Sequence, residues 1–220
     1  MKDSYQDFFD RFNISKSDLY NYGVEAVISA DFEVAKDNYN EIKRKLFNNE
    51  KLSIRGYGRN GRNSNLYLGL YSDVFGKSNI VVDPTNNAAP RRNISNATGY
   101  RINSNLINYQ VAHIWGRTKN PILFESVWNI CFVPRLFDPF TGHECKGGWN
   151  DEFIPILNRF IYDKFENIIN DYNQLITSND IENKIENYVN GLLASSVYDV
   201  DLINRFKNDA VAEWIPIIRP

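Results

Sequence analysis

Residues 108–144 read NYQVAHIWGRTKNPILFESVWNICFVPRLFDPFTGHE, and this stretch decides the fold. A short run that alternates apolar and polar residues ends near His113, and a second apolar run, WNICFVP, begins at Trp128. Such runs are typical of β-strands, and the polar segment GRTKNP between them is typical of a turn. The stretch therefore predicts two short strands joined by a loop, with the two histidines of the chain, His113 and His143, at or beyond their ends.

Helices are expected on both sides of this stretch. The first fifty residues have a helical pattern, with Ser15 as an N-cap and an apolar face between Val34 and Phe47. Three further helices are expected at 152–176, 180–194 and 200–215. Their acidic faces favour a scaffold or a dimer contact over a nucleic-acid surface.

The segment between the expected N-terminal helices and His113 is expected to be rich in strands. Short apolar runs at 52–58, 65–75 and 79–85 are separated by Gly, Asn and Pro, which favours strands. Residues 84–99 are expected to form a long polar loop. The class is therefore α+β, with a small sheet between helical ends.

Length and composition indicate one globular domain over residues 1–220. Its expected parts are a helical 1–49, a basic, strand-rich 50–149 and a helical 150–220. The hydrophobic content of 43% and charged content of 24% are ordinary for a globular protein. No apolar run approaches the roughly 18 to 20 residues of a membrane span, and the N-terminus lacks the pattern of a signal peptide. We therefore expect a cytoplasmic protein with no membrane partner.

The net charge of −2 conceals a basic middle segment. Residues 42–119 hold thirteen basic and three acidic residues, whereas the segments on both sides are acidic. Clustered Lys and Arg side chains release counterions from nucleic-acid phosphates and so add affinity. The alternative is a solvated basic surface without a partner. The residues expected to contact DNA are Arg55, Arg59, Arg62, Arg91, Arg92, Arg101 and Lys119.

The order of His113, Asn129 and His143 resembles the H, N and H of the HNH (ββα-metal) endonuclease superfamily. The resemblance covers about forty residues and implies a small antiparallel sheet with a ββα-metal motif. It implies that His113 is the general base and that Asn129 binds the metal or orients the catalytic loop. It further implies that His143 is a metal ligand and that the cofactor is Mg²⁺ or Mn²⁺. Arg117 is close enough in sequence to clamp a phosphate, as is Arg135.

The chain departs from this family just before the expected base. Most members have a metal-binding Asp or His at that position, whereas this chain has Ala112. The first metal ligand therefore stays open. Asn129 is one candidate, and Glu125, Asp138 and Glu144 are the others.

These features together predict a metal-dependent endonuclease that hydrolyses phosphodiester bonds in double-stranded DNA. The size of the chain favours a site-specific type II restriction enzyme, which would act as a homodimer because two strands need two active centres. A non-specific defence nuclease of the same superfamily is one alternative. The others are a non-catalytic nucleic-acid-binding protein and a scaffold protein.

Overall fold

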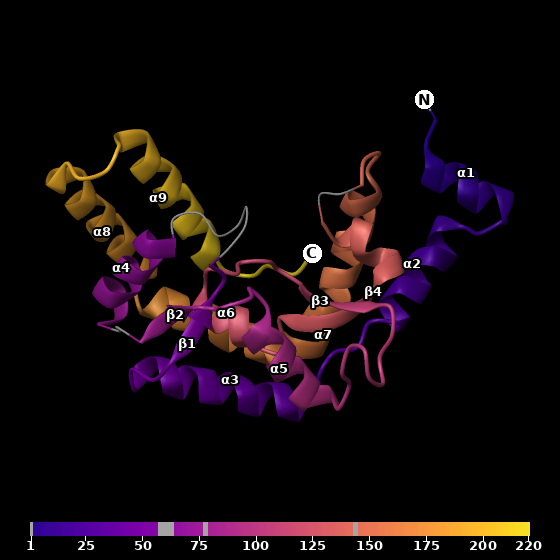
Figure 1. Ribbon diagram of the computed structural model, residues 1–220, viewed down its shortest axis with the longest axis horizontal. Helices are drawn as coiled ribbons and strands as arrows, with labels where there is room; N and C mark the ends of the chain where they lie inside the picture. Colours follow the sequence, from indigo (N-terminus) through magenta and orange to yellow (C-terminus); the bar gives the residue numbers. More distant parts are fainter. Residues whose placement is uncertain (1, 57–63, 77–78, 143–144) are drawn as a thin grey trace.

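The computed structural model describes residues 2–56, 64–76, 79–142 and 145–220. Helices dominate it, and two small sheets lie near its middle (Figure 1). The elements in chain order are α1 (Ser4–Arg11), α2 (Lys16–Glu25), α3 (Phe32–Phe47), β1 (Leu52–Ile54), α4 (Ser64–Phe75), β2 (Ile80–Val82), α5 (Ala88–Thr98), β3 (Tyr109–His113), α6 (Pro121–Glu125), β4 (Ile130–Pro134), the 3-10 helix η2 (Arg135–Thr141), α7 (Trp149–Ser178), α8 (Ile181–Ser195) and α9 (Val200–Trp214).

The predicted helices at both ends of the chain are confirmed. Ser15 caps α2, where its hydroxyl oxygen accepts a hydrogen bond from the backbone N–H of Asp18 (3.0 Å). Helix α3 buries Ala35, Tyr39 and Leu46 along one face. The three C-terminal helices form close to the predicted bounds, with the first extended to thirty residues.

The predicted antiparallel pair is confirmed as well. Strands β3 and β4 pair in antiparallel register, with His113 opposite Ile130 at one end. Strand β4 is fully buried, and β3 is half-buried. The pairing therefore leaves the side chains of β3, His113 included, at the edge of the core.

The second sheet differs from the prediction because β1 and β2 are parallel. Parallel neighbours need a crossover connection, and α4 supplies it. The expectation of a strand at 65–75 is therefore wrong. Leu66, Leu70 and Val74 recur every fourth residue and are all buried, which is the period of a helix face.

Residues 84–99, expected to be a loop, contain helix α5. The buried Asp83 carboxylate accepts hydrogen bonds from the N–H groups of Ala88 (3.1 Å) and Ala89 (2.8 Å). It thereby gives a partner to two N–H groups of the first turn, which have none within the helix. Gly99 ends the helix in the left-handed conformation (φ 75°). With α4, α5 and α6 inside it, the segment 50–149 is less rich in strands than predicted.

One hydrophobic core runs through the described part of the molecule. Helices α4, α8 and α9 gather at one end and α1 and α2 at the other, with the β3–β4 hairpin between them (Figure 1). The C-terminus lies between the two ends. Within the described ranges, no helix combines the length and apolar character needed to cross a membrane.

Candidate functional site

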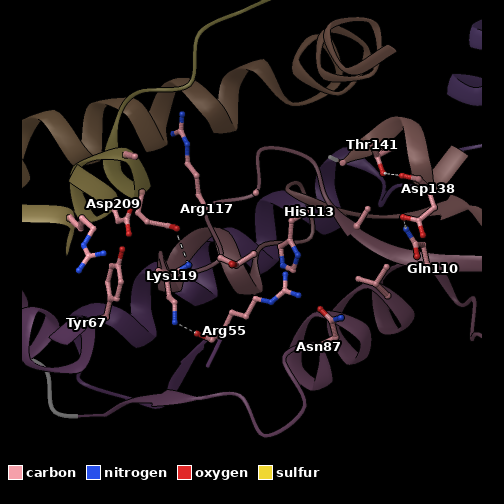
Figure 2. Close-up of a pocket in the computed structure, with 18 of the residues that line it drawn as sticks. Arg55, Tyr67, Asn87, Gln110, His113, Arg117, Lys119, Asp138, Thr141 and Asp209 are labelled. Carbon is pink, nitrogen blue, oxygen red and sulfur yellow. Dashed lines mark hydrogen bonds between the residues drawn. The ribbon is translucent and has the colours of Figure 1, made fainter. Parts of the chain in front are cut away.

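A cavity of about 990 Å³ opens beside His113. Its lining comes from the end of β1, helix α4, the residue before α5, strand β3 with the loop that follows it, η2 and α9. Figure 2 shows Arg55 and His113 in its centre, with Gln110, Asp138 and Thr141 on one side and Tyr67, Lys119 and Asp209 on the other. Some of the residues that the sequence predicts to carry chemistry therefore line one cavity, and Asn129 is not among them.

His113 is held in one orientation by the backbone of the following helix. Its Nε2 lies 3.1 Å from the carbonyl oxygen of Phe124, and its ring stacks on the Phe124 ring at 5.3 Å and 8°. Because a carbonyl can only accept, Nε2 carries the proton and donates it. In the neutral ring Nδ1 then has a free lone pair, and none of the described residues forms a hydrogen bond to it.

Burial lowers the pKa of His113 to about 4. The nearby charge of Arg55 also lowers this pKa, and the hydrogen bond to Phe124 opposes the shift. The imidazole is therefore neutral at pH 7. A neutral, oriented imidazole that faces a cavity can accept a proton from water.

Asn129 fixes the loop that separates His113 from β4. Its Oδ1 accepts a hydrogen bond from the N–H of Trp115 (3.0 Å), and its Nδ2 donates to the carbonyl of Leu123 (3.0 Å). The side chain is fully buried. The arrangement fits the loop-orienting role. The role as a metal ligand stays a prediction, and Asn129 is not among the residues that line the cavity.

Arg117 is occupied by the C-terminal segment. Its Nη1 donates to the carbonyl of Ile215, and its Nη2 lies 3.4 Å from the carbonyl of Pro216. Figure 2 shows its side chain directed away from His113. Arg117 was predicted to clamp a phosphate because it is close to His113 in sequence. The sequence gave no sign that the C-terminal segment returns to this loop.

Lys119 is also held within the protein. The side chain is 4% exposed, and Nζ donates to the carbonyl of Arg55 (2.6 Å). Burial lowers the pKa of this ammonium to about 8. The sequence predicts an exposed phosphate contact here, and the structure instead uses Lys119 to hold the chain at the end of β1.

Arg55 has the placement expected of an anion contact. Its backbone is tied to the His113 loop by its own N–H, which donates to Thr118 (2.9 Å). Its guanidinium lies beside the ring of His113 (Figure 2). Its Nε is buried and has no hydrogen-bond partner among the described residues.

The other predicted DNA contacts do not line the cavity. Arg91, Arg92 and Arg101 lie on or just after α5 and are exposed. Arg91 donates to the carbonyl of Ile102 (3.1 Å). Arg59, Arg62 and His143 lie outside the described residues.

Sequence reasoning missed the wall of the cavity that α9 provides. Arg205, Asp209 and Glu213 line the cavity from this helix. They recur every four residues and so share a helix face, which was the available signal. The acidic faces of the C-terminal helices were expected to form a scaffold or dimer contact, and in the structure this face of α9 lines the cavity.

The Glu213 side chain connects α9 to the loop that follows His113. Its Oε2 accepts hydrogen bonds from the N–H groups of Lys119 (3.0 Å) and Asn120 (3.1 Å). Burial raises the carboxyl pKa to about 7, although these two hydrogen bonds and the charges of Lys119 and Arg117 lower it. The carboxyl is therefore partly protonated near neutral pH.

The described residues do not form a complete ligand set for Mg²⁺ or Mn²⁺. No group of three His, Cys, Asp or Glu side chains is close enough to hold a metal among them. Asp138 lines the cavity and accepts from the amide of Gln110. The buried Glu125 carboxylate accepts a hydrogen bond from the N–H of Ser53 (2.7 Å). Glu144 is outside the described ranges. Of the open candidates, Asp138 alone is both described and at the cavity.

Similarity to known proteins extends over most of the chain. A protein of Pasteurella multocida (strain Pm70), called "Uncharacterized protein PM1201", is 41% identical over 190 residues, which are 85% of this chain and 86% of that protein. No solved structure matches the chain. A family model described as "Uncharacterised protein PM1201" matches residues 30–219, a range that begins after α2 and contains every residue that lines the cavity. The chain therefore belongs to this family.

Proposed function

We propose that this protein is a DNA endonuclease of the HNH type in which His113 is the general base. The observation that carries the proposal is the state of His113, which lines the cavity with Nε2 bound to the Phe124 carbonyl and with no hydrogen bond from the described residues to Nδ1. The lowered pKa keeps His113 unprotonated at working pH, and it also makes this imidazole a weaker base than one whose pKa lies near that pH.

The reaction follows from the groups around this imidazole. A water molecule attacks the phosphorus and gives its proton to Nδ1 of His113, while the bond from phosphorus to the departing sugar oxygen breaks. That oxygen takes a proton from solvent, and the imidazolium returns its proton to solvent. The Arg55 guanidinium lies where it can bind the phosphate and stabilise its growing negative charge.

Metal dependence, double-stranded DNA as the substrate, type II restriction and a homodimer remain part of the proposal and rest on the resemblance and on chain size. The exposed Arg91, Arg92 and Arg101 support a nucleic-acid partner, because they add positive charge outside the cavity. No step is assigned to a metal, since the described residues lack a complete ligand set.

The experiment is cleavage of supercoiled plasmid and linear phage DNA by the full-length protein. Reactions with Mg²⁺, with Mn²⁺ and with EDTA are compared, and His113→Ala is the matched inactive variant. Discrete fragments would support a site-specific enzyme, and a smear would support a non-specific nuclease. If DNA stays intact with both metals yet is retarded on a gel, the protein is a non-catalytic DNA-binding protein and the proposal is overturned.

A further inference from the structure

The cavity is larger than a single phosphate requires. Arg55 and His113 occupy its centre, whereas Tyr67, Lys119 and Asp209 lie to one side (Figure 2). Its volume of about 990 Å³ is at the upper end of the roughly 300 to 1,000 Å³ of sites that hold drug-sized ligands. If a phosphate binds at the centre, the cavity therefore has room for a neighbouring nucleotide on the α9 side.

Two carboxylates, Asp209 and Glu213, line that side together with the cations Lys119 and Arg205. Asp209 is exposed and Glu213 half-buried, and neither forms an ion pair with a cation of the described residues. Carboxylates repel the phosphate backbone. They accept hydrogen bonds from N–H groups. On the condition that the cavity faces the major groove, the amino groups it meets belong to cytosine and adenine, whereas guanine and thymine present acceptors there.

The orientation of Glu213 is fixed from two directions. The N–H groups of Lys119 and Asn120 hold Oε2, and the Asn120 amide donates to the carbonyl of Glu213 (3.0 Å) and to the hydroxyl of Tyr172 (2.9 Å). Helix α9 and the His113 loop are thereby locked together. The second carboxyl oxygen, Oε1, has no hydrogen-bond partner among the described residues, and the side chain lines the cavity.

We propose that Glu213, with Asp209 beside it, is a specificity determinant that accepts the amino group of a cytosine or adenine next to the phosphate bound at Arg55 and His113. This inference rests on the proposed function. A carboxylate that is held by backbone amides is pre-organised, so it discriminates between donors and acceptors better than a mobile side chain does.

A preferred site is first selected from a randomised DNA library. The test is then equilibrium binding, in EDTA and at a pH above the Glu213 pKa of about 7, to duplexes that carry each of the four bases in turn at the positions around that site. The wild type is expected to favour cytosine or adenine by about tenfold at one position. Glu213→Gln can still accept from Lys119 and Asn120 but turns an N–H₂ donor to the cavity, so its preference is expected to shift toward guanine or thymine. Glu182→Gln, an exposed substitution on α8, is the control and is expected to keep the wild-type preference.

The outcomes separate this inference from the proposed nuclease. His113→Ala is expected to keep the base preference, since the test needs no cleavage. A wild type that binds DNA without base preference, or the same preference in wild type and Glu213→Gln, overturns the inference even if the protein cleaves DNA. If Glu213→Gln fails to fold, the exposed Asp209→Asn tests the same wall and is expected to weaken the preference. A preference in a protein that never cleaves overturns the nuclease alone, and absence of all DNA binding overturns both.

Discussion

The Oδ1 of Asn129 accepts a hydrogen bond from the backbone N–H of Trp115 at 3.0 Å, and this contact closes the loop after His113. Asn129→Ala leaves the Trp115 N–H and the Leu123 carbonyl without their partner. We expect it to lower the free energy of unfolding by about 1 to 3 kcal/mol and to reduce cleavage, which urea denaturation in EDTA and a plasmid assay would measure. A variant as stable as the wild type that only needs more metal would contradict the loop role and favour direct metal binding.

Arg55 is expected to be the phosphate contact of the cavity centre. Arg55→Gln removes one cation near His113, so DNA affinity should fall and the slope of log affinity against log salt should decrease by about 1. Fluorescence anisotropy at several salt concentrations measures both. Arg159→Gln, an exposed arginine on α7, is the matched control. Equal salt slopes for the two variants would show that Arg55 contacts no phosphate.

Arg117 is expected to position the chain end instead of contacting DNA. Its guanidinium holds the carbonyls of Ile215 and Pro216, and Asn173 holds the next residue, Ile217, through both its N–H (2.8 Å) and its carbonyl (2.9 Å). Arg117→Gln should therefore speed hydrogen exchange in residues 215–219 while leaving the salt slope of DNA binding unchanged. A smaller salt slope with normal exchange would restore the phosphate contact predicted from sequence.

The lowered pKa of His113 predicts a loss of stability in acid. The folded-state pKa is about 4 and the ordinary value is 6.5, so between these values the unfolded chain binds a proton that the folded protein does not. The free energy of unfolding should fall as pH drops through this window, by up to roughly 3 kcal/mol. Denaturation at several pH values measures it, and His113→Gln should make the dependence shallower. An unchanged dependence in that variant would contradict the buried neutral imidazole.

Much of the fold follows from local sequence patterns. The β3–β4 pair and the C-terminal helices were predictable because alternation and helical periodicity are strong there. Helix α4 was not, because its buried Leu66, Leu70 and Val74 are interleaved with other apolar residues that also fit a period of two. Helix α5 depends on Asp83, which lies five residues before it and caps it from outside the helix.

The candidate site was predictable only where one segment builds it. His113 ends β3 and Asn129 directly precedes β4, and the sequence pattern located both. Glu213 reaches the cavity because α9 packs its acidic face against the His113 loop, and Arg117 turns away because the chain end passes over it. Contacts between segments nearly a hundred residues apart leave no periodic signal in one sequence.

The most direct measurement is the single-turnover rate of DNA cleavage by His113→Ala, with and without added imidazole, at protein concentrations that saturate the DNA. General base catalysis predicts a fall of about 10² to 10⁴-fold, unchanged DNA affinity and partial recovery of the rate with imidazole. A variant that cleaves DNA at the wild-type rate would show that His113 is not the base and would remove the central claim.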